Sequence, residues 1–122
     1  SRTALHLAAW HGHAAAARVL MEAGAAVEAL EPKGHTPLSL TTLSGHASAV
    51  GAIIAGRASV EAADRFGRTA LHFAAWKGHG AVVWALLAVA ADAGARDRMQ
   101  RTPLHLAALG GHDARPLRPA AR

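Results

Sequence analysis

The chain repeats itself every 33 residues, and this period constrains its fold more than any other feature. Four segments of the form Thr-(Ala or Pro)-Leu-(His or Ser) align without a gap, at 3–6, 36–39, 69–72 and 102–105. Four Gly-His pairs keep the same interval, at 12–13, 45–46, 78–79 and 111–112. A fixed period of about 20 to 50 residues indicates a repeat protein, in which each unit buries its apolar face by stacking on its neighbours. The sequence therefore predicts a short stack of similar units.

Each unit has the pattern of two short helices followed by a polar turn. The threonine that opens the unit is an N-cap candidate, because its hydroxyl can accept a backbone N–H of the first helical turn. Pro37 and Pro103 follow two of these threonines and suit the first helical position, which needs no donor. Apolar residues then recur at i, i+3 and i+4, as at Leu5, Ala8 and Ala9, which predicts a buried helical face. The glycine of each Gly-His pair should end this helix, and an apolar second helix should follow.

Together these motifs resemble the ankyrin repeat: the 33-residue period, the Thr-Pro-Leu-His box, an Ala-Ala pair, Gly-His, and a Gly-Ala after the second helix. The resemblance covers residues 2–112. It implies an all-α fold, an ankyrin-repeat solenoid of helix-turn-helix units joined by β-hairpin-like fingers, with about 3.5 repeats. It implies a binding role but no particular partner.

The period also predicts where the repeats begin and end. We expect a first repeat at 1–29 that lacks its finger, complete repeats at 30–62 and 63–95, a partial fourth repeat at 96–112, and a Pro/Arg-rich tail at 113–122. Pro116 and Pro119 fall where the second helix of the fourth repeat would run, and proline disrupts a helix interior. Because the first unit begins at its threonine, we interpret Ser1 as a truncation point within a longer protein.

Two turns depart from the repeat pattern. The glycine that follows the second helix, Gly24 in the first repeat, is replaced by Arg57 and Ala90 in the next two. This position commonly has a left-handed backbone, so a residue with a side chain costs about 1 kcal/mol there. We expect these turns either to be strained or to end one residue early, with Gly56 able to serve in the second repeat. Gln100 replaces a finger glycine, which leaves the shape of the last finger open.

Composition excludes several classes of protein. Hydrophobic residues make up 52% of the chain and charged residues 17%, which is typical of a folded domain. Without cysteine the chain has no disulfide, no thiolate nucleophile and no common structural zinc site, and we expect an intracellular protein, cytoplasmic or nuclear. The longest apolar run, 81–91, is about half of what a membrane-spanning helix needs, so no membrane insertion is expected.

Catalytic, metal and cofactor sites are not predicted. Six of the nine histidines form pairs seven residues apart, such as His6 with His13, but no cysteine or convergent carboxylate accompanies them. The resemblance implies instead that they form hydrogen bonds within the repeat. No nucleophile elbow and no phosphate-binding glycine run is present, so the chain is expected to act by recognition and not as an enzyme.

The resemblance also implies a contact surface. In ankyrin arrays the usual contact surface is the concave side, made by the finger tips and the exposed positions of the first helices. Transferred to this sequence, these positions give the predicted partner-binding residues: Trp10, His11, Lys33, His35, Leu43, Arg65, Phe66, Arg68, Trp76, Lys77, Arg98, Met99 and Arg101, with Leu109 at the corresponding place in the last repeat. Trp, Phe, Met and Arg are enriched in protein interfaces.

Trp10 and Trp76 occupy equivalent places in the first and third repeats and allow two interpretations. They are either exposed anchors for a partner or a cover over the small alanines between neighbouring helices. Trp84, on the second helix of the third repeat, is expected to face outward or to meet a missing neighbour.

The leading hypothesis is a protein-interaction module that grips another protein, with its arginines complementary to an acidic segment. The alternative is binding of nucleic acid or another anionic surface through the basic fingers and tail, which would depend steeply on salt. A net charge of +5 is modest for that role, and no nucleic-acid-binding motif is present, so nucleic acid is the less favoured partner. The oligomeric state is left open.

Overall fold

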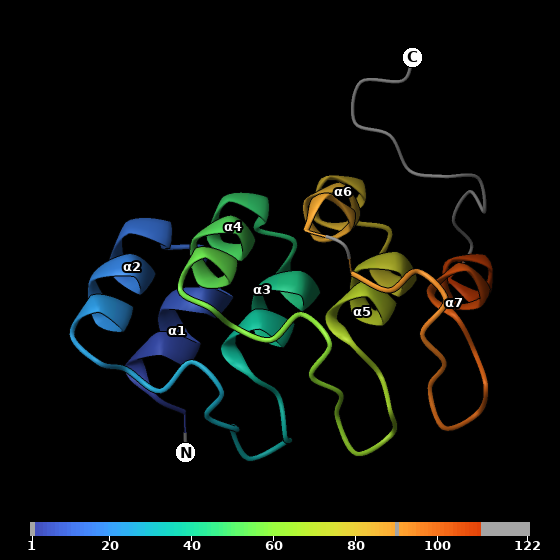
Figure 1. Ribbon diagram of the computed structural model, residues 1–122, viewed down its shortest axis with the longest axis horizontal. Helices are drawn as coiled ribbons and strands as arrows, with labels where there is room; N and C mark the ends of the chain where they lie inside the picture. The colour runs from blue at the N-terminus through green and yellow to red at the C-terminus, as the bar shows by residue number, and fades with distance from the viewer. Residues whose placement is uncertain (1, 90, 111–122) are drawn as a thin grey trace.

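The computed structural model describes residues 2–89 and 91–110, and within them the chain forms seven α-helices and no β-strand (Figure 1). In chain order they are α1 (Ala4–Trp10), α2 (Ala14–Glu22), α3 (Pro37–Ser44), α4 (Ala47–Ala55), α5 (Ala70–Lys77), α6 (Gly80–Ala88) and α7 (Pro103–Leu109). The predicted all-α repeat fold is confirmed. The predicted tail, 113–122, lies outside the described residues.

The helices form two parallel rows (Figure 1). The first helices, α1, α3, α5 and α7, pack side by side in one row, and the second helices, α2, α4 and α6, pack in the other. Three loops before α3, α5 and α7 project from the first row on the side away from the second helices. These loops, residues 31–35, 64–68 and 97–101, are the fingers predicted from the sequence.

Each first helix begins at the threonine that the period singles out. Thr3, Thr36, Thr69 and Thr102 are all N-caps, and each side chain accepts the backbone N–H three residues later. In three of the four repeats that third residue is a histidine whose side chain bonds back to the N-cap, which completes a capping box. The helix starts are therefore fixed by local chemistry, before any stacking.

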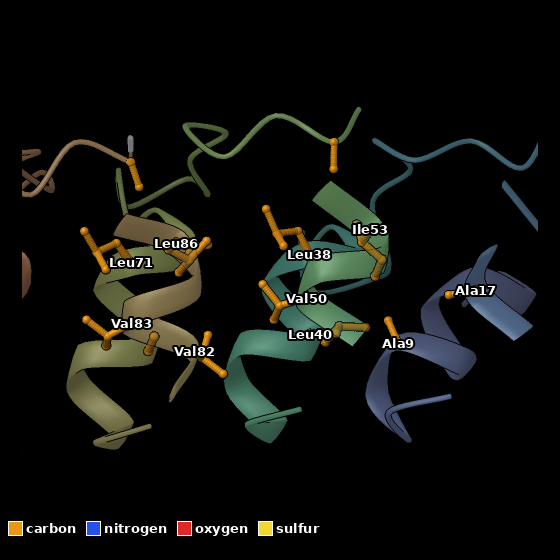
Figure 2. Close-up of a cluster of buried hydrophobic side chains, with 14 of the residues drawn as sticks. Ala9, Ala17, Leu38, Leu40, Val50, Ile53, Leu71, Val82, Val83 and Leu86 are labelled. Atoms are coloured by element: carbon orange, nitrogen blue, oxygen red, sulfur yellow. The ribbon is translucent and has the colours of Figure 1, made fainter. Parts of the chain in front are cut away.

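The core lies between the two rows, where side chains from first and second helices meet (Figure 2). Its larger members in the second and third repeats are Leu38, Val50, Ile53, Leu71, Val82 and Leu86. Two buried threonines, Thr41 and Thr42, replace the usual alanines in the second repeat. Their hydroxyls donate to the carbonyl oxygens of Leu38 and Ser39, both at 2.7 Å, so the buried polar groups are satisfied.

Two residues other than glycine adopt the left-handed backbone conformation, one in the turn after α4 and one in the last finger. Arg57 has φ +72° and Gln100 has φ +64°, the left-handed region that favours glycine. Gly56 does not relieve the second repeat, since its φ is −80°. The last finger nevertheless keeps its shape, because Asp97 N–H donates to the carbonyl of Arg101 at 3.0 Å. Ala90 lies outside the described residues.

Candidate protein-interaction surface

A buried carboxylate organises each finger from inside. Asp64 accepts the backbone N–H groups of Phe66 and Arg68, both at 2.9 Å. Asp97 holds the last finger in the same way, and Glu31 does so in the first with its N–H partners at 2.7 and 3.0 Å. These three carboxylates were not among the predicted site residues, although their 33-residue spacing was a usable signal.

The same carboxylates also hold cationic side chains. The guanidinium of Arg68 lies 2.8 Å from Asp64, and that of Arg101 lies 2.9 Å from Asp97. Burial by itself raises the pKa of both aspartates, but the backbone and guanidinium N–H groups outweigh it and hold each pKa below its ordinary value. Two of the four arginines predicted to face a partner are therefore already paired within their own fingers.

The first finger repeats this arrangement with different side chains around its carboxylate. Glu31 lies 3.2 Å from the ring Nδ1 of His35 and 3.6 Å from the guanidinium of Arg2. Burial raises the pKa of Glu31, but the backbone N–H groups of His35 and Lys33, together with the side chains of His35 and Arg2, lower it by more, so the net pKa is below its ordinary value. His35 is half-buried and packs edge-on against Phe73, with ring centroids 5.7 Å apart.

The finger tips carry cations that the carboxylates do not neutralise. Lys33, Arg65 and Arg98 are exposed, and none of them forms an ion pair within the described part of the chain. Arg65 instead lies 5.8 Å from the ring of Phe66. Lys77, at the end of α5, lies 5.3 Å from the ring of Trp76. The acidic groups are thus used inside the fingers, and the positive charge is left at their tips.

A row of apolar residues follows the first helices, one from each repeat. Trp10, Leu43, Trp76 and Leu109 are spaced by 33 residues, so each occupies the same place on its helix. The side chain of Trp10 is 37% exposed and that of Trp76 is 44% exposed, while Leu43 is half-buried. Large parts of both indoles are therefore open to solvent. Phe66 and Met99 add exposed apolar groups at the finger tips.

A small pocket lies where the third and fourth repeats meet. Its volume is about 120 Å³, and it opens between α5, α7 and their fingers. It is lined by Arg68, His72, Phe73, Trp76, Arg101, Leu106 and Leu109. Four of the predicted contact residues, Arg68, Trp76, Arg101 and Leu109, line this pocket.

Two further residues considered in the sequence, His11 and Trp84, do not line this pocket. His11 stacks on His13 in the turn after α1, with ring centroids 6.0 Å apart, and does not line the pocket. Trp84 is half-buried, and its indole nitrogen is buried with no hydrogen-bond partner among the described residues. The side chain is therefore only partly open to solvent, and its polar atom is covered.

Neither a metal site nor a membrane-spanning helix is found in the residues that the structure describes. No group of three or more His, Asp or Glu side chains in residues 2–89 and 91–110 is arranged to hold a metal ion. None of the helices in the same part of the chain is long and apolar enough to cross a membrane.

The family model described as ankyrin repeats (3 copies) matches the chain at residues 5–97 and 57–115. The chain therefore belongs to the ankyrin repeat family. Ankyrin repeats are in general protein-protein interaction modules, and the family is typically not enzymatic. No match was found among curated proteins.

Proposed function

We propose that this chain binds a partner protein along the surface formed by its finger tips and the exposed ends of its first helices, and that the bound segment is acidic. The observation that carries this proposal is the division of charge in the fingers. Glu31, Asp64 and Asp97 are used inside, while Lys33, Arg65 and Arg98 are left at the tips without carboxylate partners in the described residues.

The apolar residues on this surface suit the same role. Partly exposed tryptophans beside cations are the residue types that dominate binding energy in protein interfaces. Arg65 and Lys77 sit over the rings of Phe66 and Trp76, so each cation also keeps an apolar neighbour in place. A partner segment with carboxylates and a few apolar side chains would find both kinds of contact along one line.

Affinity capture on the immobilised chain, followed by calorimetry with the captured partner, tests this proposal. The double variant Trp76→Ala with Phe66→Ala should weaken binding by at least about tenfold, because each side chain loses exposed aromatic contact area. Arg65→Glu should also weaken binding. Arg18→Glu, the same charge change at an exposed position on α2, is the control and should leave the affinity unchanged.

Wild-type affinity in the double variant would contradict the proposal. The dependence of affinity on salt distinguishes binding of an acidic protein segment from the alternative, binding of nucleic acid. Binding of nucleic acid releases counterions and should fall steeply with ionic strength, whereas binding of a short acidic protein segment should fall only modestly.

A further inference from the structure

The pocket between α5 and α7 has an apolar floor and open apolar sides. Phe73 and Leu106 are almost completely buried and form the floor, since they lie on adjacent first helices one repeat apart. Trp76 and Leu109 also line the pocket and are much more exposed, at 44% and 65%. An apolar group entering between them would cover surface that now faces water, and this burial is favourable.

The polar side chains of the pocket offer hydrogen-bond donors, and among the described residues none of them offers a free acceptor. Nε and Nη2 of Arg68 contact the carboxylate of Asp64, and Nε of Arg101 donates to the carboxylate of Asp97. Each guanidinium therefore retains N–H groups without a partner in the described residues. The third polar side chain is His72, whose two ring nitrogens are both engaged, by Thr69 and by the carbonyl of Arg101. A carboxylate can be satisfied at this wall, whereas a cation cannot.

The pocket is limited in size. Apolar cavities of about 150 Å³ accommodate a benzene ring, so a pocket of about 120 Å³ suits a smaller group. The side chain of Val, Leu, Ile or Met has this character. An indole is too large to enter.

The contact between α3 and α5, one repeat earlier, has different residues at the positions that form the pocket between α5 and α7. Phe73 occupies there the place that Leu106 holds at the next step, and the ring of His35 packs against it where Arg68 stands one repeat later. The ring of phenylalanine takes up more of this space than the side chain of leucine does. The change from Phe73 to Leu106 is therefore part of what opens the space between the third and fourth repeats.

We infer that this pocket is an anchor site that takes one aliphatic side chain of the bound partner, with a carboxylate of the same partner held beside it by the guanidinium groups of Arg68 and Arg101. The inference rests on the proposed function and makes it more specific. The occupant is an acidic protein segment with Leu, Ile, Val or Met within a few residues of Asp or Glu.

A random peptide library displayed on phage and selected on the immobilised chain tests the inference. The selected peptides should be enriched in an aliphatic residue close to Asp or Glu. The synthetic form of the best peptide should lose at least about tenfold in affinity when its aliphatic residue is changed to alanine, as measured by calorimetry.

Two variants of the chain close or dismantle the pocket without touching the finger cations. Leu106→Phe fills the floor with the side chain that the preceding step already carries, and Leu109→Ser removes an exposed side. Both should weaken the peptide by at least about tenfold. Val19→Ser on α2 is the control, because Val19 is 63% exposed and does not line the pocket. Circular dichroism checks that each variant is folded, and Leu109→Ser remains informative if Leu106→Phe is not.

The outcomes separate the anchor site from the wider function. Peptides that lack the aliphatic residue, or that bind both pocket variants as tightly as wild type, would overturn the anchor site. If such peptides were still acidic and were lost on Arg65→Glu, the proposed function would stand without it. Failure to enrich any peptide over the blank support would count against both.

Discussion

The Nε2 atom of His72 lies 2.8 Å from the carbonyl oxygen of Arg101, in the finger of the next repeat. On the other side of the ring, Nδ1 accepts the backbone N–H of Thr69 at 3.1 Å, so the proton must be on Nε2, which donates to the carbonyl. One side chain thus caps its own helix and fastens the following finger. His6 does the same for the carbonyl of His35, at 3.0 Å.

Replacing His72 with alanine should therefore cost more than the loss of a helix cap. We expect His72→Ala to lower the free energy of unfolding by about 2–4 kcal/mol, because it leaves a cavity and the Arg101 carbonyl without this donor. His105→Ala is the matched control, since His105 makes the same capping contacts with Thr102 but is exposed. It should cost about 1 kcal/mol. Urea unfolding followed by circular dichroism measures both, and equal losses would argue against the inter-repeat role.

Ser39 stands where the first, third and fourth repeats have this histidine. Its hydroxyl accepts a hydrogen bond from Thr36 at 3.2 Å and does not reach the next finger. Ser39→His should add the missing bond to the carbonyl of Arg68 and raise the free energy of unfolding by about 1 kcal/mol. Ser48→His, at an exposed position on α4, should change it little. A destabilised Ser39→His variant would mean that the site cannot admit the ring.

The finger aspartates should make stability depend on acid pH. Burial raises the pKa of Asp64 and Asp97, but the N–H groups around them lower each pKa overall below 3.8, the value expected for an unfolded chain. The unfolded chain therefore binds protons first, so this stabilisation is fully present above about pH 4 and is lost as the pH falls through the lower folded pKa.

A double variant, Asp64→Asn with Asp97→Asn, isolates this contribution. It should be less stable than wild type at about pH 7, and the difference between the two should shrink below about pH 4, when the wild-type carboxylates also become neutral. Thermal unfolding across this range measures it. A difference that stays constant with pH would show that charge on these side chains does not matter.

Glycine should relieve the two left-handed turns. Arg57→Gly and Gln100→Gly are each expected to raise the free energy of unfolding by about 0.5–1 kcal/mol, because the relief of backbone strain exceeds the added freedom of the unfolded chain. The reverse test is Gly34→Ala, where φ is +85° and an added Cβ would meet no atom within 4 Å. It should cost about 1 kcal/mol from the backbone alone. Denaturation midpoints that move the opposite way would contradict the assignment of strain.

The helices were predictable because their signals are local. Each threonine cap acts within one turn of its own helix, and Gly45 and Gly78 end α3 and α5 in the left-handed conformation, so spacing alone placed these helix ends. The ion pair of Arg68 with Asp64 was not predicted, although Asp64 lies only four residues earlier in the chain. The pocket could not be predicted, since it depends on how Phe73 and Leu106 fill the space between helices that only stacking brings together.

The serine at position 39 also has a mechanical consequence. The first finger is tied to α1 through His6, and the last is tied to α5 through His72, but no hydrogen bond in the described residues ties the middle finger, 64–68, to α3. We therefore expect the array to bend more readily at the contact between α3 and α5 than at the contacts on either side of it. A ligand that contacts the repeats on both sides of this contact would fix the angle between the two halves of the array. Its binding affinity would be lowered by the free energy needed to fix that angle, whereas the affinity of a ligand held only by the last two repeats would not be.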